Sequence, residues 1–95
     1  MDLGISGRKA IICAASRGLG RGAAFALAEA GCDLVLNSQT AERLEATANE
    51  LRARFPVQVR TIAGDISDPK VQAAVLDSCP EPDILINNNG GPPRR

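Results

Sequence analysis

The sequence contains no histidine, no tyrosine and no tryptophan, and its only aromatic residues are Phe25 and Phe55. Without histidine, catalysis by an imidazole is excluded, and so are most zinc sites. The three cysteines, Cys13, Cys32 and Cys79, form no Cys-x-x-Cys pair, which argues against a metal knuckle or a disulfide framework. Their apolar surroundings are typical of reduced, buried thiols, and we therefore expect a cytoplasmic protein.

The 95 residues also lack an excess of charge of either sign, because eleven basic side chains balance eleven acidic ones. A nucleic-acid surface needs a basic excess to displace counterions, so we expect no nucleic-acid partner. No apolar run approaches the ~18 residues that a membrane span requires, and no polybasic stretch is present, so we expect no membrane partner. The length suits one small domain.

Four apolar runs of strand length alternate with three helical patterns along the chain. Such alternation is typical of a parallel sheet whose crossover helices pack on its faces. Gly31 is placed to end the first helix, Thr40 to cap the second, and Asp68 with Pro69 to open the third. The predicted strands cover residues 9–13, 33–37, 57–62 and 83–87, and the predicted helices cover residues 21–30, 41–54 and 69–78.

The segment Ser16-Arg17-Gly18-Leu19-Gly20 lies between the first predicted strand and the first predicted helix. A strand-to-helix turn directs backbone N–H groups and a helix N-terminus outward, which favours the binding of a phosphate. Glycine suits this position because a Cβ atom would block the approach of a pyrophosphate. Taken alone, the segment is also compatible with a tight turn that binds nothing.

The wider segment Cys13–Gly20 resembles the Thr-Gly-x-x-x-Gly-x-Gly motif of the short-chain dehydrogenase/reductase family. Gly18 and Gly20 match, whereas Cys13 replaces the threonine and Ala14 replaces the first glycine. The resemblance covers nearly the whole chain. It implies a Rossmann-type α/β fold, a parallel sheet of order 3-2-1-4 with flanking helices, truncated after the fourth strand. It also assigns residues 1–95 to the N-terminal, NAD(P)-binding part of a single domain.

Gly64-Asp65-Ile66 follows the third predicted strand, at the distance that the family requires. The resemblance implies that Asp65 accepts a hydrogen bond from the adenine amino group and that Ile66 flanks the adenine ring. From the residues alone, Asp65 is also compatible with a turn or N-cap role.

Asn87-Asn88-Asn89-Gly90 follows the fourth predicted strand and resembles the family's Asn-Asn-Ala-Gly, with Asn89 in the place of the alanine. The resemblance implies that the backbone beside Asn88 and Gly90 lines the adenosine ribose. The alternative is a turn that tolerates left-handed backbone.

The preference between NAD and NADP depends on what meets the 2′ position of the adenosine ribose. An NAD enzyme places a carboxylate at the end of the second strand to accept from the 2′-hydroxyl. Here Ser38 and Gln39 stand at that end, and no carboxylate occurs before Glu42. Arg17 is where many NADP-using members of the family keep a basic residue, and a guanidinium can hold a phosphate through two hydrogen bonds. We therefore expect NADP rather than NAD; Arg43 is either a second contact or a solvated helix residue.

The resemblance implies an oxidoreductase that transfers a hydride between a nicotinamide and a carbonyl or alcohol carbon, using a Ser…Tyr-x-x-x-Lys arrangement. The chain has no tyrosine, and its lysines, Lys9 and Lys70, do not fit that arrangement. We therefore assign no catalytic residue and no metal ligand. The chemistry is expected in a longer parent enzyme that acts on a small-molecule carbonyl or alcohol and forms a homo-oligomer. The segment Gly90-Gly91-Pro92-Pro93 resembles 3-oxoacyl-(acyl-carrier-protein) reductase-like members.

Two other interpretations stay open at this point. One is a nucleotide-binding fragment without chemistry, and the other is a flavodoxin-like α/β domain with Asp33 and Asp65 in an acidic pocket, which the glycine turn disfavours. The predicted cofactor contacts are Ala14, Ser16, Arg17, Gly18, Leu19, Gly20, Ser38, Gln39, Asp65, Ile66, Asn88, Asn89 and Gly90.

Overall fold

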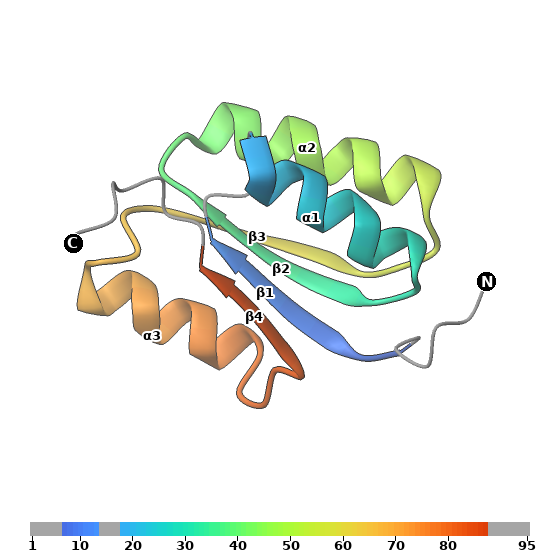
Figure 1. Cartoon of the computed structure of the whole chain (residues 1–95). Helices are drawn as coiled ribbons and strands as arrows, with labels where there is room; N and C mark the ends of the chain where they lie inside the picture. The colour runs from blue at the N-terminus through green and yellow to red at the C-terminus, as the bar shows by residue number, and fades with distance from the viewer. Residues whose placement is uncertain (1–6, 14–17, 88–95) are drawn as a thin grey trace.

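The computed structural model describes residues 7–13 and 18–87 and shows a parallel sheet with helices on both faces (Figure 1). The sheet has four strands in the order β3-β2-β1-β4, as expected for a Rossmann-type fold. In a flavodoxin-like domain β3 would lie on the other side of β1, so the observed order excludes that alternative. The strands are β1 Lys9–Cys13, β2 Asp33–Ser38, β3 Val59–Ala63 and β4 Ile84–Asn87; the helices are α1 Gly18–Glu29, α2 Ala41–Arg54 and α3 Pro69–Ser78.

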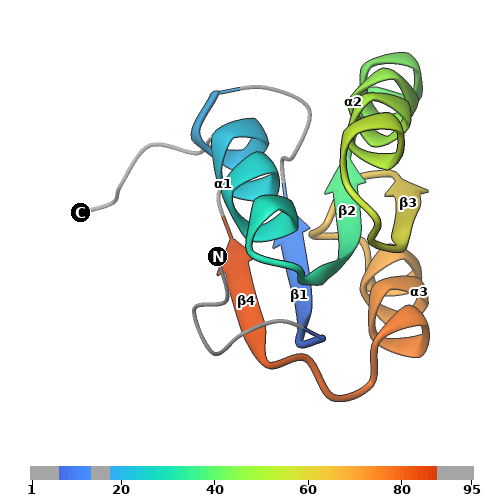
Figure 2. The same ribbon diagram turned by 90° about the vertical axis from the view of Figure 1, so that its right-hand side faces the viewer.

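The helices divide the molecule into three layers, with α1 and α2 on one face of the sheet and α3 on the other (Figure 2). Ile12 and Leu36 point to the layer of α1 and α2, whereas Ile11 and Val35 point to α3. Both faces of β1 and β2 are therefore buried, which explains why these strands are continuous apolar runs rather than alternating ones.

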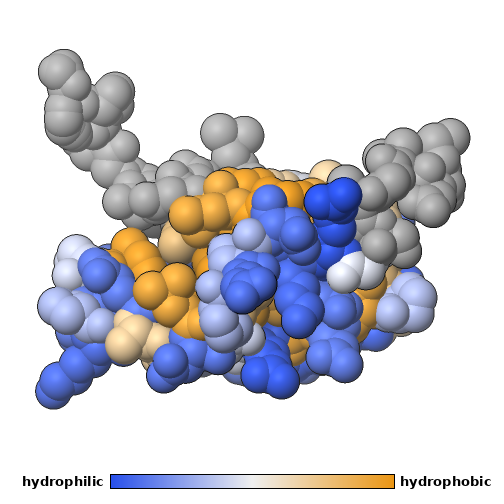
Figure 3. Space-filling model, turned by 90° about the horizontal axis from the view of Figure 1, so that it is seen from below, coloured by the Kyte–Doolittle hydropathy of each residue, from blue (hydrophilic) through white to orange (hydrophobic). Residues whose placement is uncertain are grey.

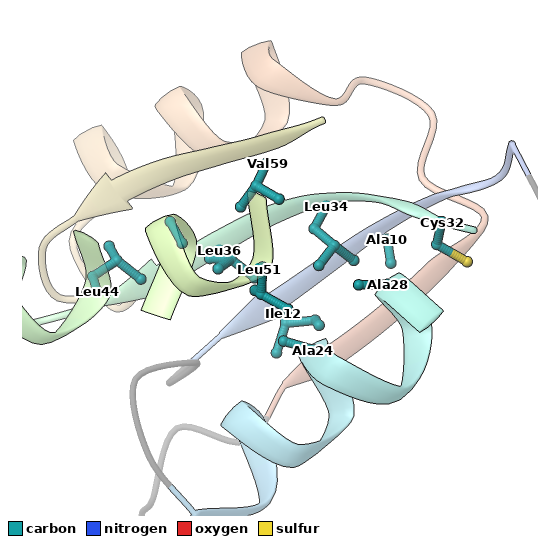
Figure 4. Close-up of a cluster of buried hydrophobic side chains, with 11 residues drawn as sticks. Ala10, Ile12, Ala24, Ala28, Cys32, Leu34, Leu36, Leu44, Leu51 and Val59 are labelled. Carbon is teal, nitrogen blue, oxygen red and sulfur yellow. The ribbon is translucent and has the colours of Figure 1, made fainter. Parts of the chain in front are cut away.

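The larger of the two cores lies beneath α1 and α2 (Figure 4). Small residues of α1, Ala24 and Ala28, allow this helix to approach β1 closely. The predicted apolar face of α2, Leu44, Ala48 and Leu51, is fully buried, as its spacing indicated. The core members are Ala10, Ile12, Ala24, Ala28, Cys32, Leu34, Leu36, Leu44, Ala48, Leu51 and Val59.

Hydrogen bonds at the helix ends confirm two of the three predicted caps. Gly31 has a φ of 96°, and the N–H groups of Gly31 and Cys32 donate to the carbonyls of Ala28 and Leu27, a Schellman arrangement that ends α1. The Asp68 carboxylate accepts from the backbone N–H of Lys70 at 2.9 Å and opens α3. Thr40 occupies the N-cap position of α2, but its side chain makes no capping hydrogen bond.

The boundaries of four elements differ from those predicted: β2 and β4 by a single residue, and α1 and β3 by more. The first helix begins at Gly18 rather than at residue 21, so the two matching glycines of the family motif belong to its first turn. The third strand begins at Val59 rather than at residue 57, because the backbone N–H of Gln58 donates to the Asp33 carboxylate instead of joining the ladder.

The free edge of the sheet at β3 is covered by an arginine of α2. The Val59 carbonyl points away from β2, since its neighbour Gln58 provides the carbonyl that accepts from Leu34. The Arg52 guanidinium donates to that outward Val59 carbonyl through Nε at 3.1 Å and Nη2 at 2.5 Å, and it lies 3.6 Å from the Glu45 carboxylate. A charged side chain at this place blocks pairing by another strand.

The opposite edge of the sheet has a more apolar surface. Leu85 of β4 is the neighbour of buried Ile11 on the face of α3, yet it is 64% exposed, and Leu76 of α3 is 54% exposed. Figure 3, which views the molecule from the side of α3 and β4, shows apolar surface between hydrophilic side chains.

Leu36 and Leu85 form a matched pair for testing this core. Leu36→Ala is expected to lower the free energy of unfolding by about 2–5 kcal/mol, because it leaves a cavity at a side chain with no exposed surface. Leu85→Ala removes the same atoms from a largely exposed side chain and should cost no more than about 1 kcal/mol. Urea unfolding followed by far-ultraviolet circular dichroism measures both, and equal losses would contradict the assignment of the core.

Candidate cofactor-binding site

The carboxyl ends of all four strands meet along one edge of the sheet. Cys13 at the end of β1 is paired with Asn37 of β2 on one side and with Asn87 of β4 on the other, and Ser38 is paired with Ala63 of β3. The strand order reverses between β1 and β4, where the chain leaves β1 toward α1 and reaches β4 from α3 on the other face. A crevice of this kind outside the strand ends is where ligands bind in open α/β sheets.

The N-terminus of α1 begins five residues after β1 ends, at this same edge. The first N–H groups of a helix have no partner within the helix, and together with the helix dipole they attract an anion. No acidic residue lies in the first turn of α1 to oppose one, and Gly20 is buried. The backbone of Gly18–Gly20 thus fits a bound phosphate, while Ala14, Ser16 and Arg17 lie outside the described residues.

The end of β2 presents neutral groups to the edge of the sheet. Ser38 is buried, and its hydroxyl accepts from the Thr40 N–H at 3.3 Å, whereas Gln39 and Thr40 are exposed. The next carboxylate along the chain, that of Glu42, is exposed in the first turn of α2, and Arg43 beside it is exposed too. The strand end therefore holds no carboxylate that would repel an added phosphate.

Asn37 is a buried polar residue that the sequence analysis did not assign to the site. Only 2% of its surface is exposed, and its amide Nδ2 donates to the carbonyl of Ile62 at 3.0 Å and to that of Gly64 at 3.1 Å. Because the Gly64 N–H in turn donates to the Ser38 carbonyl at 2.9 Å, the peptide groups on both sides of Gly64 are tied to β2. An asparagine at the end of an apolar strand was the signal that could have identified it.

The turn between β3 and α3 requires glycine at position 64. Gly64 has a φ of 142°, and a Cβ atom there would lie 2.6 Å from Cγ2 of Val71 in α3. The turn is closed by a hydrogen bond of 2.9 Å from the Asp68 N–H to the Asp65 carbonyl, and the Gln72 side chain donates to the Ile66 carbonyl at 2.9 Å. Ile66 is half-buried against the core below α3.

Asp65 is exposed at this turn, as a residue that contacts a ligand must be. Its Oδ1 accepts from the Ser67 N–H at 2.9 Å and from the Ser67 hydroxyl at 2.8 Å. These bonds, the backbone one first, hold the pKa of the Asp65 carboxyl below its usual value, so the group is ionised at neutral pH. The spacing of Asp65 and Ser67 is that of a local side-chain turn, a signal present in the sequence but not used.

Cys13, at the threonine position of the family motif, is directed into the core below α3 with Ile11 and Val35. Burial raises the pKa of its thiol, so the group is a neutral thiol at neutral pH. The side chain therefore contributes packing rather than charge at the end of β1. Asn87 closes β4 beside it, and Asn88, Asn89 and Gly90 lie outside the described residues.

Other features of the described residues do not compete with this edge. A pocket of about 80 Å³ lies at the opposite, amino end of the sheet, lined among others by Lys9, Asp33 and Arg60. Asp33 and Asp65 stand at opposite ends of parallel strands, so they do not form one acidic pocket. Among residues 7–13 and 18–87, no group of side chains is suited to hold a metal ion, and no helix is long and apolar enough to cross a membrane.

Comparison with known proteins agrees with this topology. The model of the short chain dehydrogenase family matches residues 8–95. A reductase of Bacillus subtilis, named NADPH-dependent reductase BacG, is 35% identical over 95 residues, which cover 94% of this chain and 37% of that protein. L-xylulose reductase of Mesocricetus auratus is 34% identical over 88 residues, which cover 93% of this chain and 34% of that protein.

Solved structures give the same result. The crystal structure of L-sorbose reductase from Gluconobacter frateurii, complexed with NADPH and L-sorbose, superposes with a TM-score of 0.90 at 35% identity and covers 100% of this chain and 38% of that one. The chain belongs to the short-chain dehydrogenase family, and it spans about a third of the length of the curated relatives that it matches.

Gly64→Ala tests the conformation of the turn. The substitution is expected to destabilise the fold by about 1–3 kcal/mol, because alanine is strained at this φ and its Cβ meets a stiff, β-branched side chain. Adding Val71→Ala removes the clash but not the backbone strain, so the double variant should recover only part of the loss after the cost of Val71→Ala alone is subtracted. Thermal or urea unfolding of the four proteins measures this, and full additivity would show that Gly64 does not press against Val71.

The lowered pKa of Asp65 predicts a pH dependence with a definite sign. The hydrogen bonds from Ser67 favour the charged carboxylate, so their stabilisation is present above the ordinary pKa of about 3.9 and is lost as the pH falls through the lower pKa of the folded state. Ser67→Ala removes the hydroxyl but keeps the N–H, so the pKa of Asp65 should rise part of the way. Carboxyl NMR titration reads this directly, with Ser78→Ala as the control; an unchanged Asp65 pKa in Ser67→Ala would refute the hydrogen bond.

Proposed function

We propose that this chain forms the NADP(H)-binding part of a single Rossmann domain, residues 1–95, in a longer oxidoreductase. The observation that carries the proposal is the meeting of a glycine-containing helix N-terminus with the reversal of strand order between β1 and β4. Backbone N–H groups at such a place can hold a pyrophosphate without a charged side chain. Gly18, Leu19 and Gly20 are proposed to cradle the pyrophosphate, with Ala14 and Ser16 completing the turn.

The preference for NADP is supported by the neutral end of β2 together with a basic residue in the glycine turn. Ser38 and Gln39 carry no charge, so they leave room for the 2′-phosphate that a carboxylate would repel. Arg17 is proposed to pair with that phosphate through two charge-assisted hydrogen bonds. The relatives give independent support, since the matching reductase of Bacillus subtilis is named NADPH-dependent and the matching sorbose reductase was crystallised with NADPH.

The adenosine end is proposed to lie across the ends of β2, β3 and β4. Asp65 would accept from the adenine amino group, with Ile66 against the ring. The backbone at Asn88, Asn89 and Gly90 would line the ribose. The exposure of Asp65 and its ionised state support this role, because a carboxylate can only accept.

A bound NADPH supplies the hydride in this chemistry, and the residues of this chain hold and orient it. The chain has no tyrosine; Lys9 lies at the start of β1, at the amino end of the sheet, and Lys70 lies in the first turn of α3, so neither belongs to a Tyr-x-x-x-Lys arrangement. We therefore propose that the serine, tyrosine and lysine that move the proton belong to other segments of the parent enzyme. This chain contributes no catalytic residue.

We propose a small-molecule carbonyl or alcohol as the substrate class, in a cytoplasmic parent that forms a homo-oligomer. The relatives named as reductases of xylulose and of very-long-chain 3-oxoacyl-CoA act on carbonyl groups. The second of these, from Aspergillus clavatus, is 39% identical over 94 residues and supports the 3-oxoacyl reductase-like assignment. A nucleotide-binding fragment without chemistry is the competing function, and NADPH oxidation by the parent protein with a 3-oxoacyl thioester distinguishes the two.

Arg17→Ala tests the cofactor assignment. The affinity for NADPH should fall about 10- to 100-fold, as expected for the loss of hydrogen bonds between charged groups, while the affinity for NADH stays within about twofold. Titration calorimetry of the 95-residue chain measures both. Arg60→Ala is the matched control, because Arg60 is an exposed arginine of β3 that lines the pocket at the amino end of the sheet, away from the proposed site. Equal affinities of the unaltered chain for NADPH and NADH would overturn the NADP assignment.

A further inference from the structure

Ser67 engages one oxygen of the Asp65 carboxylate and leaves the other open. Both bonds from Ser67, the N–H at 2.9 Å and the hydroxyl at 2.8 Å, end on Oδ1. Among the described residues, Oδ2 receives no hydrogen bond that competes with a ligand, and the side chain is exposed. The carboxylate therefore has one oxygen fixed to the protein and one available as an acceptor.

The backbone that carries Asp65 is fixed as well, from two directions. On one side, Asn37 donates to the Gly64 carbonyl and the Gly64 N–H donates to Ser38, so the residue before Asp65 is tied to β2. On the other side, Gln72 of α3 holds the carbonyl of Ile66. With its main chain held, Asp65 keeps only the two torsions of its own side chain, and the two bonds from Ser67 restrict these.

We propose that Ser67 is a positioning residue that orients Asp65, so that Oδ2 faces the amino group of the cofactor's base and selects adenine. The inference rests on the proposed function, which supplies the adenine contact. Ser67 itself touches no part of the cofactor; it acts through Asp65 alone. A carboxylate held in a fixed direction discriminates better between bases than a freely rotating one, because it cannot rotate away from a base that presents an acceptor.

The chemistry of the base provides a probe for this orientation. Adenine presents an amino donor at its sixth position, whereas hypoxanthine presents a carbonyl acceptor at the same position. An Oδ2 atom held in a fixed direction accepts a hydrogen bond from the amino group of adenine and repels the carbonyl oxygen of hypoxanthine. If Ser67 fixes that direction, removing its hydroxyl should weaken the binding of NADPH and leave the hypoxanthine analogue unaffected or slightly better bound.

The experiment titrates NADPH and reduced nicotinamide hypoxanthine dinucleotide phosphate into the 95-residue chain and its variants by calorimetry. Ser67→Ala is expected to lower the affinity for NADPH about 3- to 10-fold, which corresponds to the typical net contribution of one intramolecular hydrogen bond, and to change that for the analogue less than about twofold. Ser67→Thr keeps the hydroxyl and should restore the discrimination. Ser78→Ala, a serine of α3 at the other end of the helix, is the control, and circular dichroism checks that each variant is folded.

The outcomes separate the role of Ser67 from the binding of NADPH itself. If Ser67→Ala weakens both cofactors equally, Ser67 has only a structural role and the proposal is overturned. If it weakens neither, the proposal is overturned as well, while NADPH binding by the unaltered chain still supports the proposed function. Failure of the unaltered chain to bind NADPH overturns the proposed function and this inference with it. Asp65→Asn gives an independent check, because an amide can donate to hypoxanthine and should shift the preference toward the analogue.

Discussion

Parallel pairing of β1 with β2 on one side and β4 on the other is the constraint from which the candidate site follows. Parallel neighbours need crossover connections, and the right-handedness of these connections sends α1 and α3 to opposite faces of the sheet. All four carboxyl ends then share one edge, and the N-terminus of α1 opens toward it. No single side chain creates this arrangement. It results from buried strands that must be covered on both faces, which the apolar residues of β1 and β2 require.

At this edge of the sheet, some polar residues stabilise the protein's own turns, and others remain available to bind a ligand. Asn37 is buried, and its amide group donates hydrogen bonds to one carbonyl of β3 and one of the turn that follows β3. The backbone N–H and the hydroxyl of Ser67 both donate hydrogen bonds to one oxygen of Asp65. Among the described residues, this edge also offers the backbone N–H groups at the start of α1, the exposed Gln39 and the second oxygen of Asp65. A dinucleotide, which offers a diphosphate, a ribose and a base with one amino group, is complementary to that set.

The sequence predicted the parts of this structure that depend on local chemistry. Gly31 and Asp68 terminate and open helices through bonds to their own neighbourhood, and the spacing of Leu44, Ala48 and Leu51 reports one helix face. The start of α1 was placed three residues too late, because glycine is a poor helix former and nothing local indicates that Gly18–Gly20 continue the helix. In the fold, Gly20 is buried and Ala24 packs in the core beneath α1 and α2, which is tertiary context that the local sequence does not show.

The contacts of Asn37 and of Arg52 could not be predicted from the neighbouring sequence, since each contact joins elements that only the folded sheet brings together. The contact of Arg52 with β3 also has a directional consequence. With the outward carbonyl of Val59 already occupied by a guanidinium, β3 offers no complete ladder to a further strand. A strand that extended the sheet at β3 would have to displace this guanidinium, so a further strand, whether from the same polypeptide or another, is expected to pair with β4, beside the crevice between β1 and β4.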